Sequence, residues 1–528
     1  MEQKAKIVKN YVIKRILKIK IKGEKIKMKK IYFGVAALAG LASVALASCG
    51  EEVGPTTQNP GETTTEVDPG TTTTEVQEPQ EGMHEDKTVD LTASLKTSDF
   101  SGSAEDKTIV FYHTMGDSLQ ETLQVAIDAF NAKYPDWTIE HSQIGGYNDV
   151  RSRCIAGLAA GNQPDLAYCY ADHVAQYLKT GKVVDMSDYV NATGTLNGEA
   201  IGYSATEIAD FVQGYYKEGF ATNYGAYSNY GYKDGDILTF PFVKSTEVLY
   251  YNKDALKDAG IEKVPSTWDE LWDACEILVN KYPDCTPLGY DSEANWVITM
   301  AEQNGWGYTS ASEPHYLFNN EKLAAWLDDL YDKYQEYYFT TQTENGGYTS
   351  GLFTKGPEAG GTVFSIGSSG GASHQGTDAF HWGVAPMPGS KQADGTVNAA
   401  AISQGPSLVM FQSEAKNETE RQLMTWEFVK CLEDATFQAA FSMTSGYNPT
   451  RLSTFEIPDY AEFLEGDSIV AVTAGVAATM SDRFYTSPAF SGSSTARDQM
   501  EAALLYVIRG QKTGADALTD AYKACGGK

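Results

Sequence analysis

Several polar and aromatic side chains follow apolar runs directly, where the chain is expected to leave a strand. His113 follows TIVFY, Tyr147 follows two glycines in GGYND, and Asp172 follows PDLAYCYA. Tyrosine and aspartate can exchange hydrogen bonds with ligand hydroxyl groups, and paired glycines permit close backbone approach. Each residue also has a structural alternative: Tyr147 could be an ordinary loop residue, Asp172 could cap the next helix, and His113 could bond a backbone carbonyl. The chemistry that these loops offer is hydrogen bonding to a polar ligand.

A second group of residues could bind an anion. Ser368 and Ser369 lie in SIGSSGGASH, a Gly/Ser turn expected between a strand and a helix. Such a turn offers free backbone N–H groups and hydroxyls to an oxyanion. Arg497 lies in STARDQM, and a guanidinium binds phosphate or carboxylate through two parallel hydrogen bonds. The turn could equally bind nothing, and Arg497 could be a surface residue of the last long helix.

Patterns that would indicate catalysis, a metal site or a cofactor are missing from the sequence. It contains no HExxH, CxxC or GxxxxGKS pattern, and its seven histidines are scattered. We therefore expect no catalytic residues, no metal and no cofactor. The chain has 70 acidic and 41 basic residues, a net charge of −29 that would repel nucleic acid.

Aromatic residues are concentrated in one region of the chain. Aromatic faces stack on the C–H faces of sugar rings, although core packing will account for most of these side chains. The aromatic residues that are not needed for packing fit a carbohydrate ligand better than a bare amino acid. The residues are Tyr215, Tyr216, Tyr224, Tyr227, Tyr230 and Tyr232, followed by Trp296 and Trp306.

The elements that must position these residues alternate between strand and helix. Apolar runs predict strands at 108–113, 137–143 and 164–170. Helical spacing predicts helices at 119–135, ending before Pro135, and at 148–161. This alternation predicts an α/β fold with a mostly parallel sheet, in which ligands bind beyond the carboxyl ends of the strands.

The first 48 residues predict an export signal. KMKK precedes the uncharged run Ile31–Ser48, which ends in small residues, and Met28 could be the true start. A retained membrane span is the alternative, since 18 apolar residues are near the lower limit for crossing a bilayer. Leu46-Ala47-Ser48-Cys49 resembles the lipobox of bacterial lipoproteins. That resemblance implies that Cys49 is lipidated and becomes the first residue of the mature chain.

Residues 49–106 predict a flexible tether, and 107–528 a folded body. The tether is rich in Thr, Glu, Pro and Gly, and it repeats TTTEV at 63–67 and 72–76. Such a composition buries too little apolar area to offset the entropy of ordering. A glycosylated stalk is the alternative. The six cysteines after Cys49 do not indicate a disulfide framework, although Cys275 and Cys285 could either pair or remain buried thiols.

The most specific stretch is PFVKSTEVLYYNKDALKDAGIEKVPSTWDELWDACEIL, residues 241–278. It resembles the segment that joins the two lobes in bacterial extracellular solute-binding proteins (family 1) of ABC importers. Its second half predicts a helix capped by Ser266 or Thr267. Six further stretches, among them FHWGVAPMPG and the closing helix ARDQMEAALLYVIRGQKTGADAL, match in family order over nearly all of 107–525. The greatest similarity is to the subgroup that binds sn-glycerol 3-phosphate or carbohydrate.

The resemblance implies a two-lobed, type II periplasmic-binding-protein-like fold that closes on a ligand. Lobe 1 would comprise about 107–247 and 407–446, and lobe 2 about 248–406 and 447–528. Crossings between the lobes would act as hinges. They are expected near Ser245–Tyr250, Ser407–Phe411 and Gly446–Thr450.

The resemblance also implies ligand-binding roles for particular residues. Arg497 aligns with the arginine that neutralises phosphate in the glycerol-phosphate binders. Where those proteins have a glutamate, this chain has Ala171, and Asp172 is one residue further on. The full candidate set is Tyr147, Asp172, Ser245, Ser368, Ser369, Gly405, Tyr447 and Arg497, with His113 added from its position after a strand.

We therefore expect a substrate-binding lipoprotein of an ABC transporter, and not an enzyme. It would capture a sugar or an sn-glycerol-3-phosphate-like solute and deliver it to a membrane permease. It would be a monomer, held on the outer face of the cell membrane by its lipid. The alternatives are an exported glycoside hydrolase with paired carboxylates, or an adhesin that grips glycans without transport.

Overall fold

The computed structural model describes residues 80–413 and 415–527. The predicted signal with Met28, the predicted lipidation site Cys49 and the first part of the predicted tether lie outside these residues. Among the described helices, none has the length and apolar content needed to cross a membrane.

Lobe 1 is built around a five-stranded sheet with the order β3-β2-β4-β17-β7. Apolar side chains of these strands are buried under helices from two separate parts of the chain. The strands are β2 (Thr108–His113), β3 (Thr138–Gln143), β4 (Leu166–Cys169), β7 (Phe240–Pro241) and β17 (Ser407–Met410). The helices are α2 (Asp117–Lys133), α3 (Tyr147–Ala160), α4 (Ala171–Tyr177), α5 (Ser187–Val190), α6 (Ala205–Ala209), α7 (Gln213–Lys217), α14 (Glu418–Leu432) and α15 (Ala435–Ser445).

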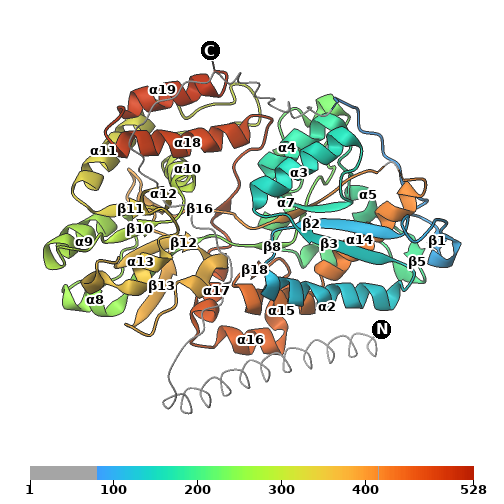
Figure 1. Ribbon diagram of the computed structural model, residues 1–528, viewed down its shortest axis with the longest axis horizontal. Helices are drawn as coiled ribbons and strands as arrows, with labels where there is room; N and C mark the ends of the chain where they lie inside the picture. The colour runs from blue at the N-terminus through green and yellow to red at the C-terminus, as the bar shows by residue number, and fades with distance from the viewer. Residues whose placement is uncertain (1–79, 414, 528) are drawn as a thin grey trace, which may run out of the picture. The chain divides into compact units, whose positions relative to one another are not determined.

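Lobe 2 is built around a second five-stranded sheet, with the order β11-β10-β12-β9-β13. Figure 1 shows its helices α10, α11, α18 and α19 grouped on one side of these strands. The strands are β9 (Glu247–Asn252), β10 (Leu288–Tyr290), β11 (Phe339–Thr341), β12 (Phe364–Ser368) and β13 (Trp382–Pro386). The helices are α8 (Lys253–Asp258), α9 (Trp268–Lys281), α10 (Glu293–Asn304), α11 (Glu321–Gln335), α12 (Gln342–Asn345), α13 (Ser350–Lys355), α17 (Ile469–Ala478), α18 (Ser493–Ile508) and α19 (Gly514–Ala524).

Both sheets are mixed, and in each of them four of the five strands run in one direction, in agreement with the mostly parallel sheets that the sequence predicted. In lobe 1, β2 runs parallel to β3 and β4, but β17 is antiparallel to both of its neighbours. In lobe 2, β10 is parallel to its neighbours, while β9 is antiparallel to β12 and β13. The antiparallel strands β9 and β17 are those that enter a sheet directly from a crossing between lobes. Their direction is therefore set by the other lobe and not by a local strand–helix–strand connection.

The predicted helix after the lobe junction forms as α9, and its cap is Thr267. The Thr267 side chain accepts a hydrogen bond from the Glu270 backbone N–H, which completes a capping box. Trp268, Leu271, Cys275 and Leu278 are buried on one face of the helix. Cys275 and Cys285 are both buried free thiols.

Three short ladders and bridges form where the chain crosses between the lobes. Strand β8 (Val243–Lys244) pairs with β18 (Asn448–Pro449), so the first and third connecting segments lie side by side. Ser245 and Gln404 exchange backbone hydrogen bonds of 2.9 and 2.8 Å, which adds the second segment. Strand β16 (Ala401–Ile402) pairs with β19 (Phe484–Tyr485) on the lobe 2 side.

Residues 451–464 lie with lobe 1, although the sequence-based boundary placed everything after 446 in lobe 2. Arg451 makes a 2.7 Å ion pair with Asp210, and its guanidinium lies 4.6 Å from the centre of the Phe211 ring. Helix α16 (Pro458–Leu464) packs on α15, and only α17 reaches the lobe 2 sheet. The Arg451 contacts hold the chain on lobe 1 past the predicted boundary.

Residues 80–106 are packed against lobe 1, whereas the sequence predicted a tether up to residue 106. Strand β1 (Ser94–Leu95) pairs with β5 (Thr195–Leu196), which also pairs with β6 (Glu199–Ala200). Leu91 and Phe100 are each 9% exposed, and the His84 ring stacks 4.4 Å from Tyr232. A few apolar residues thus dock a segment whose average composition is polar.

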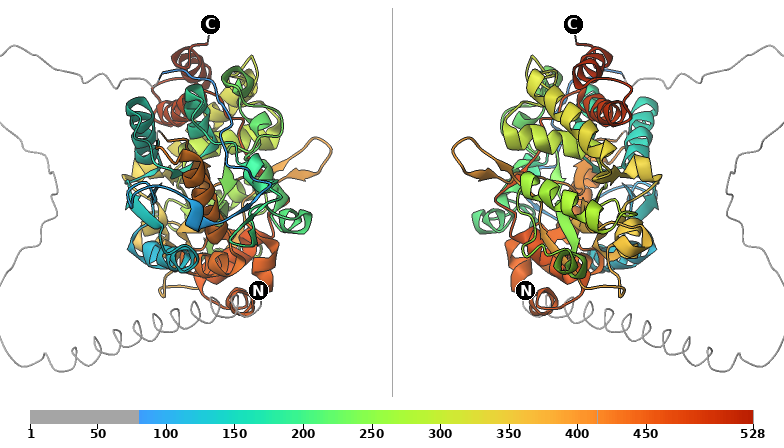
Figure 2. Two further views of the ribbon diagram at one scale, coloured as in Figure 1. Left: turned by 90° about the vertical axis from the view of Figure 1, so that its right-hand side faces the viewer. Right: turned by 90° about the vertical axis from the view of Figure 1, so that its left-hand side faces the viewer.

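A two-stranded hairpin of β14 (Ser390–Lys391) and β15 (Val397–Asn398) projects from lobe 2 (Figure 2).

The six crowded tyrosines and Trp296 serve packing more than ligand contact. Trp296, Tyr215, Tyr224 and Tyr232 are almost fully buried.

Candidate functional site

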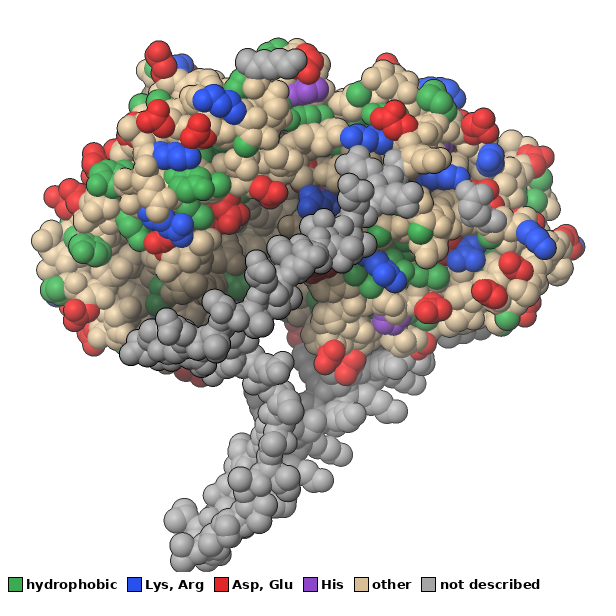
Figure 3. All heavy atoms as spheres, turned by 45° about the horizontal axis from the view of Figure 1, so that its top comes forward, with side chains coloured by type: hydrophobic (Ala, Val, Ile, Leu, Met, Phe, Trp, Pro, Cys, Tyr) green, Lys and Arg blue, Asp and Glu red, His purple; other side chains and the backbone are tan. Residues whose placement is uncertain are grey.

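A cavity of about 390 Å³ lies between the two lobes, and we call it the interlobe cavity. Lobe 1 contributes the loops after β3 and β4, which are the loops beyond the carboxyl ends of its parallel strands. Lobe 2 contributes Asn295, Tyr308 and the start of α18, and the second crossing contributes residues 402–405. In Figure 3 the described surface is hollowed toward its centre, with Lys or Arg side chains at the hollow.

Four of the nine predicted binding residues line the interlobe cavity. They are Tyr147, Asp172, Gly405 and Arg497. Tyr147 is the first residue of α3, directly after the extended Gly146, and its ring lies 4.4 Å from that of Tyr170. Gly405 has φ +88°, a conformation that favours glycine, and a side chain there would come within 2.5 Å of the Val243 carbonyl oxygen.

The other five predicted residues border the cavity region or lie elsewhere. The Ser369 hydroxyl accepts a 3.2 Å bond from the Thr246 N–H, and the Ser368 hydroxyl accepts one of the same length from the Gly370 N–H. Ser245 is 2% exposed in the bridge to Gln404. These groups are used within the protein in this structure, so their contact with a ligand stays a prediction.

Tyr447 is a neighbour of Tyr147: burial raises the pKa of Tyr147, and the nearby Tyr170, Tyr447 and Tyr168 add to that rise. A Cβ atom at Gly370 would come within 2.9 Å of the Tyr447 ring, so the glycine allows this close contact. Tyr447 therefore supports a residue of the cavity wall.

His113 is buried in lobe 1 and does not line the interlobe cavity. Its Nδ1 accepts a 3.1 Å hydrogen bond from the Met115 N–H, so Nε2 carries the proton that it donates to His141 Nδ1 at 2.9 Å. Burial, together with the neighbouring His141, lowers the pKa of His113 to about 3. Its observed partners are thus a backbone N–H and a second histidine, and not the backbone carbonyl named as its structural alternative.

A buried series of hydrogen bonds fixes the orientation of the Arg497 guanidinium. Its Nη1 donates to Asn295 Oδ1, and Asn295 Nδ2 donates to Glu247 Oε1 at 3.0 Å. The Tyr290 hydroxyl donates to the other Glu247 oxygen at 2.6 Å. Burial raises the pKa of Glu247 to about 7, and the hydrogen bonds from Tyr290 and Asn295 limit that rise. The guanidinium is therefore oriented before any ligand arrives.

Asp172 joins the two lobes beside Arg497. Its Oδ2 accepts a 3.0 Å hydrogen bond from the Ser494 hydroxyl of α18. Burial alone would raise the pKa of Asp172, but His173, Arg497 and the Ser494 hydroxyl hold that pKa below its ordinary value. The carboxylate is therefore ionised near neutral pH and offers acceptors to ligand hydroxyl groups.

Sequence reasoning missed a buried ion pair in the same cavity. Lys244 Nζ lies 2.6 Å from Glu218 Oε2, and it also donates to the Ser407 hydroxyl at 3.0 Å. One signal for Lys244 was available, because a charged residue in the apolar run PFVKSTEVLYYN is unusual. The sequence around Glu218, which is rich in tyrosine, gives no comparable signal.

A larger hollow of about 750 Å³ lies beside the β14–β15 hairpin. It is lined by Glu302, Arg483 and Tyr485 among others, and by none of the nine predicted binding residues. Convergent charged and polar side chains therefore favour the interlobe cavity as the ligand site.

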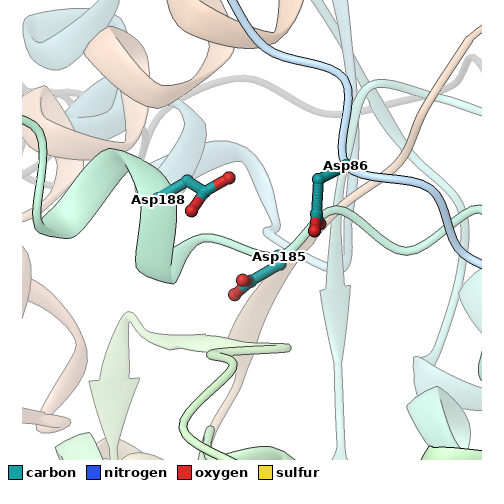
Figure 4. A group of neighbouring side chains, drawn as sticks. All are labelled: Asp86, Asp185 and Asp188. Carbon is teal, nitrogen blue, oxygen red and sulfur yellow. The ribbon is translucent and has the colours of Figure 1, made fainter. Parts of the chain in front are cut away.

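A group of three carboxylates in lobe 1 could be mistaken for a metal site. Asp86, Asp185 and Asp188 offer oxygens within 4.8 Å of one another (Figure 4). Asp185 already accepts bonds from Ser187 and from the Ile237 N–H, and Asp86 is paired with His84 and Lys233. These contacts already hold two of the three carboxylates within the protein.

Comparison with known proteins agrees with this geometry. The profile of the family described as "Bacterial extracellular solute-binding protein" matches residues 125–463. The sn-glycerol-3-phosphate-binding periplasmic protein UgpB of Escherichia coli is 26% identical over 370 residues, which are 68% of this chain and 77% of that protein.

Solved structures show the same fold. UgpB from Mycobacterium tuberculosis in complex with glycerophosphocholine superposes with a TM-score of 0.61 at 18% identity, over 81% of this chain and 98% of that one. The sugar-binding protein MalE from Xanthomonas citri also gives 0.61 at 18% identity, over 79% and 95% of the two chains.

The fold is thus the two-lobed, type II periplasmic-binding-protein fold that the sequence predicted. With its family profile matched over more than half its length, the chain belongs to the bacterial extracellular solute-binding protein family.

Proposed function

We propose that this protein captures a small polyhydroxylated solute, a sugar or an sn-glycerol-3-phosphate-like molecule, between its two lobes. One observation carries the proposal. Asp172 of lobe 1 and Arg497 of lobe 2 both line one cavity, so a ligand that bonds to both must bridge the lobes. Such a ligand binds the closed arrangement better than an open one and shifts the population toward it.

The charges of the cavity fit this class of solute. Arg497 offers a guanidinium fork to a phosphate or a carboxylate, and Asp172 offers acceptors to hydroxyl groups. The relatives named above that bind sn-glycerol 3-phosphate, glycerophosphocholine or sugars support the same class.

The captured solute would be delivered to the permease of an ABC transporter. Family membership supports this partner, and the lipobox-like Cys49 supports a lipid anchor on the outer face of the membrane. A monomer is sufficient, because both halves of the cavity come from one chain.

Thermal denaturation of the purified protein with candidate solutes tests the proposal. A ligand that binds only the folded state must raise Tm by mass action. We expect stabilisation by sn-glycerol 3-phosphate, glycerophosphocholine or maltose. Absence of any shift across this panel, or cleavage of a glycosidic bond without stabilisation by an intact ligand, would refute it.

A further inference from the structure

The buried pair of Lys244 and Glu218 lies in a part of the interlobe cavity built by other elements than those that hold Arg497. Lys244 is in β8, at the first crossing between lobes, and Glu218 follows α7. Their side chains are only 4% and 12% exposed, yet both line the cavity. Arg497 comes from α18 of lobe 2. The cavity therefore carries two sets of charged side chains that come from different elements.

The pair retains hydrogen-bonding capacity on the cavity side. An ammonium group has three donors, and the described residues supply two partners, Glu218 and the Ser407 hydroxyl. A carboxylate accepts through both oxygens, and the Lys244 bond occupies one of them, Oε2. A donor and an acceptor thus stand side by side, and their charges cancel.

Two further hydroxyl groups of the same cavity lack partners. The oxygens of Ser403 and Ser487 are buried, and no described residue bonds to either side chain. A buried hydroxyl without a partner carries a desolvation cost that a suitable ligand group would remove. The cavity is therefore incomplete without a ligand that brings several hydrogen-bonding groups.

The chemistry of this region selects hydroxyl groups over ions. A second anion would meet the Glu218 carboxylate, and a cation would meet the Lys244 ammonium. A hydroxyl group can donate to the carboxylate and accept from the ammonium at the same time, because it has both functions.

We propose that Lys244 and Glu218, with the hydroxyls of Ser403 and Ser487, form a polyol subsite that reads neighbouring hydroxyl groups of the ligand. We call these four residues the polyol subsite. The inference rests on the function proposed above and deepens it, since it assigns the hydroxyl groups and the charged group of one ligand to different parts of the cavity. Arg497 binds the charged group, where there is one.

A purely structural role would predict a different outcome of mutation. Replacing a buried ion pair by neutral side chains of similar size is often neutral for stability or even stabilising. The double variant Lys244→Met/Glu218→Gln removes both charges together and leaves neither uncompensated. It is expected to fold and to lose only hydroxyl recognition.

The test compares two probes that differ only in their hydroxyl groups, sn-glycerol 3-phosphate and n-propyl phosphate, by isothermal titration calorimetry. The wild-type protein should bind the first at least tenfold more tightly. In Lys244→Met/Glu218→Gln this ratio should fall below threefold. In Arg497→Met both affinities should fall while their ratio is kept.

Controls separate the subsite from general damage. Lys133→Met/Glu199→Gln removes an exposed pair of the same residue types, 2.8 Å apart, and should leave both affinities unchanged. If the first double variant fails to fold, Ser403→Ala/Ser487→Ala tests the same region, with an expected loss of at least threefold in the ratio. If maltose is the probe that binds, its affinity should fall at least tenfold in Lys244→Met/Glu218→Gln.

The outcomes distinguish the two proposals. A wild-type protein that binds both phosphates equally, or a ratio that survives the subsite variants, overturns the polyol subsite and leaves solute capture standing. A wild-type protein that binds none of the three probes overturns the proposed function and the subsite with it.

Discussion

At the scale of single residues, we propose that Arg497 selects the solutes that the cavity binds. Its guanidinium is fixed by Asn295 and lies beside the ionised Asp172. An oriented, buried cation of this kind favours a ligand with a negative group.

Arg497→Ala should therefore weaken binding of a phosphate ester by about 2 kcal/mol or more, because the ligand charge would be left buried without its partner. Titration calorimetry with sn-glycerol 3-phosphate and with maltose measures this effect. Arg509→Ala, at the exposed end of the same helix, is the matched control and should change nothing. An unchanged affinity in Arg497→Ala would indicate a neutral ligand.

Glu247 makes the stability of the protein depend on pH. Its pKa is about 7 in the folded protein against 4.5 as its ordinary value. Between these values the folded state holds a proton that the unfolded state has lost, so stability falls as pH rises. The difference corresponds to about 3 kcal/mol, lost progressively as the pH rises from about 4.5 to about 7.

Glu247→Gln should remove this part of the pH dependence. Urea denaturation of wild type and variant at pH 4.5 and at pH 8 gives the comparison, and the variant should gain relative stability at the higher pH. Glu313→Gln, whose side chain is 83% exposed, is the control. Parallel pH profiles of wild type and Glu247→Gln would show that the Glu247 pKa is not raised.

At the scale of elements, the segment 80–106 belongs to lobe 1. It lays β1 beside β5 and buries Leu91 and Phe100. Phe100→Ala should lower the free energy of unfolding by about 3 kcal/mol, since a buried ring leaves a cavity when it is removed. Met83→Ala, in the same segment but 64% exposed, should change stability by less than about 0.5 kcal/mol. Equal effects of the two variants in urea denaturation would show that the segment is not docked.

The second crossing between the lobes depends on Gly405. Gly405 and Gly395 have nearly the same backbone conformation, with φ of +88° and +85°. A Cβ at Gly405 would meet the Val243 carbonyl oxygen at 2.5 Å, whereas Gly395 has open space around it. Gly395→Ala should cost about 1 kcal/mol from conformation alone, and Gly405→Ala about 1–3 kcal/mol more from the added clash. Denaturant unfolding of both variants separates the cost of the backbone conformation from the cost of the clash with Val243. Equal losses of stability would contradict the close approach of the chain at Gly405.

At the scale of the whole body, residues 80–413 and 415–527, the lobes touch close to the cavity. Asp172 accepts from Ser494, and the Gly225 N–H donates to the Ala489 carbonyl at 2.6 Å. The closure proposed above would add to these contacts, so that a ligand bonded to both lobes shifts the population toward the closed arrangement.

Ser494→Ala should weaken ligand binding by on the order of threefold to tenfold, because it removes about 1 kcal/mol from the closed state alone. Small-angle X-ray scattering with and without a saturating ligand measures closure directly, and the radius of gyration should fall on binding. Ser373→Ala, an exposed position in lobe 2, is the control. A radius unchanged by a bound ligand would contradict closure.

The sequence by itself determined the family, the first strands and helices of lobe 1, and part of the site. Strand β2 spans the predicted 108–113, and Tyr147, Asp172, Gly405 and Arg497 all line the interlobe cavity. These features are local, since periodicity and capping act within a few residues of the chain.

Only the tertiary structure decided the pairing of Lys244 with Glu218, the mixed direction of both sheets and the docking of 80–106. The two charges are 26 residues apart, and the same distance along the chain could have placed them on different faces. The sheets are mixed because β9 and β17 arrive from the opposite lobe. Each of these features depends on where separate segments meet in space, and no local propensity encodes such a meeting.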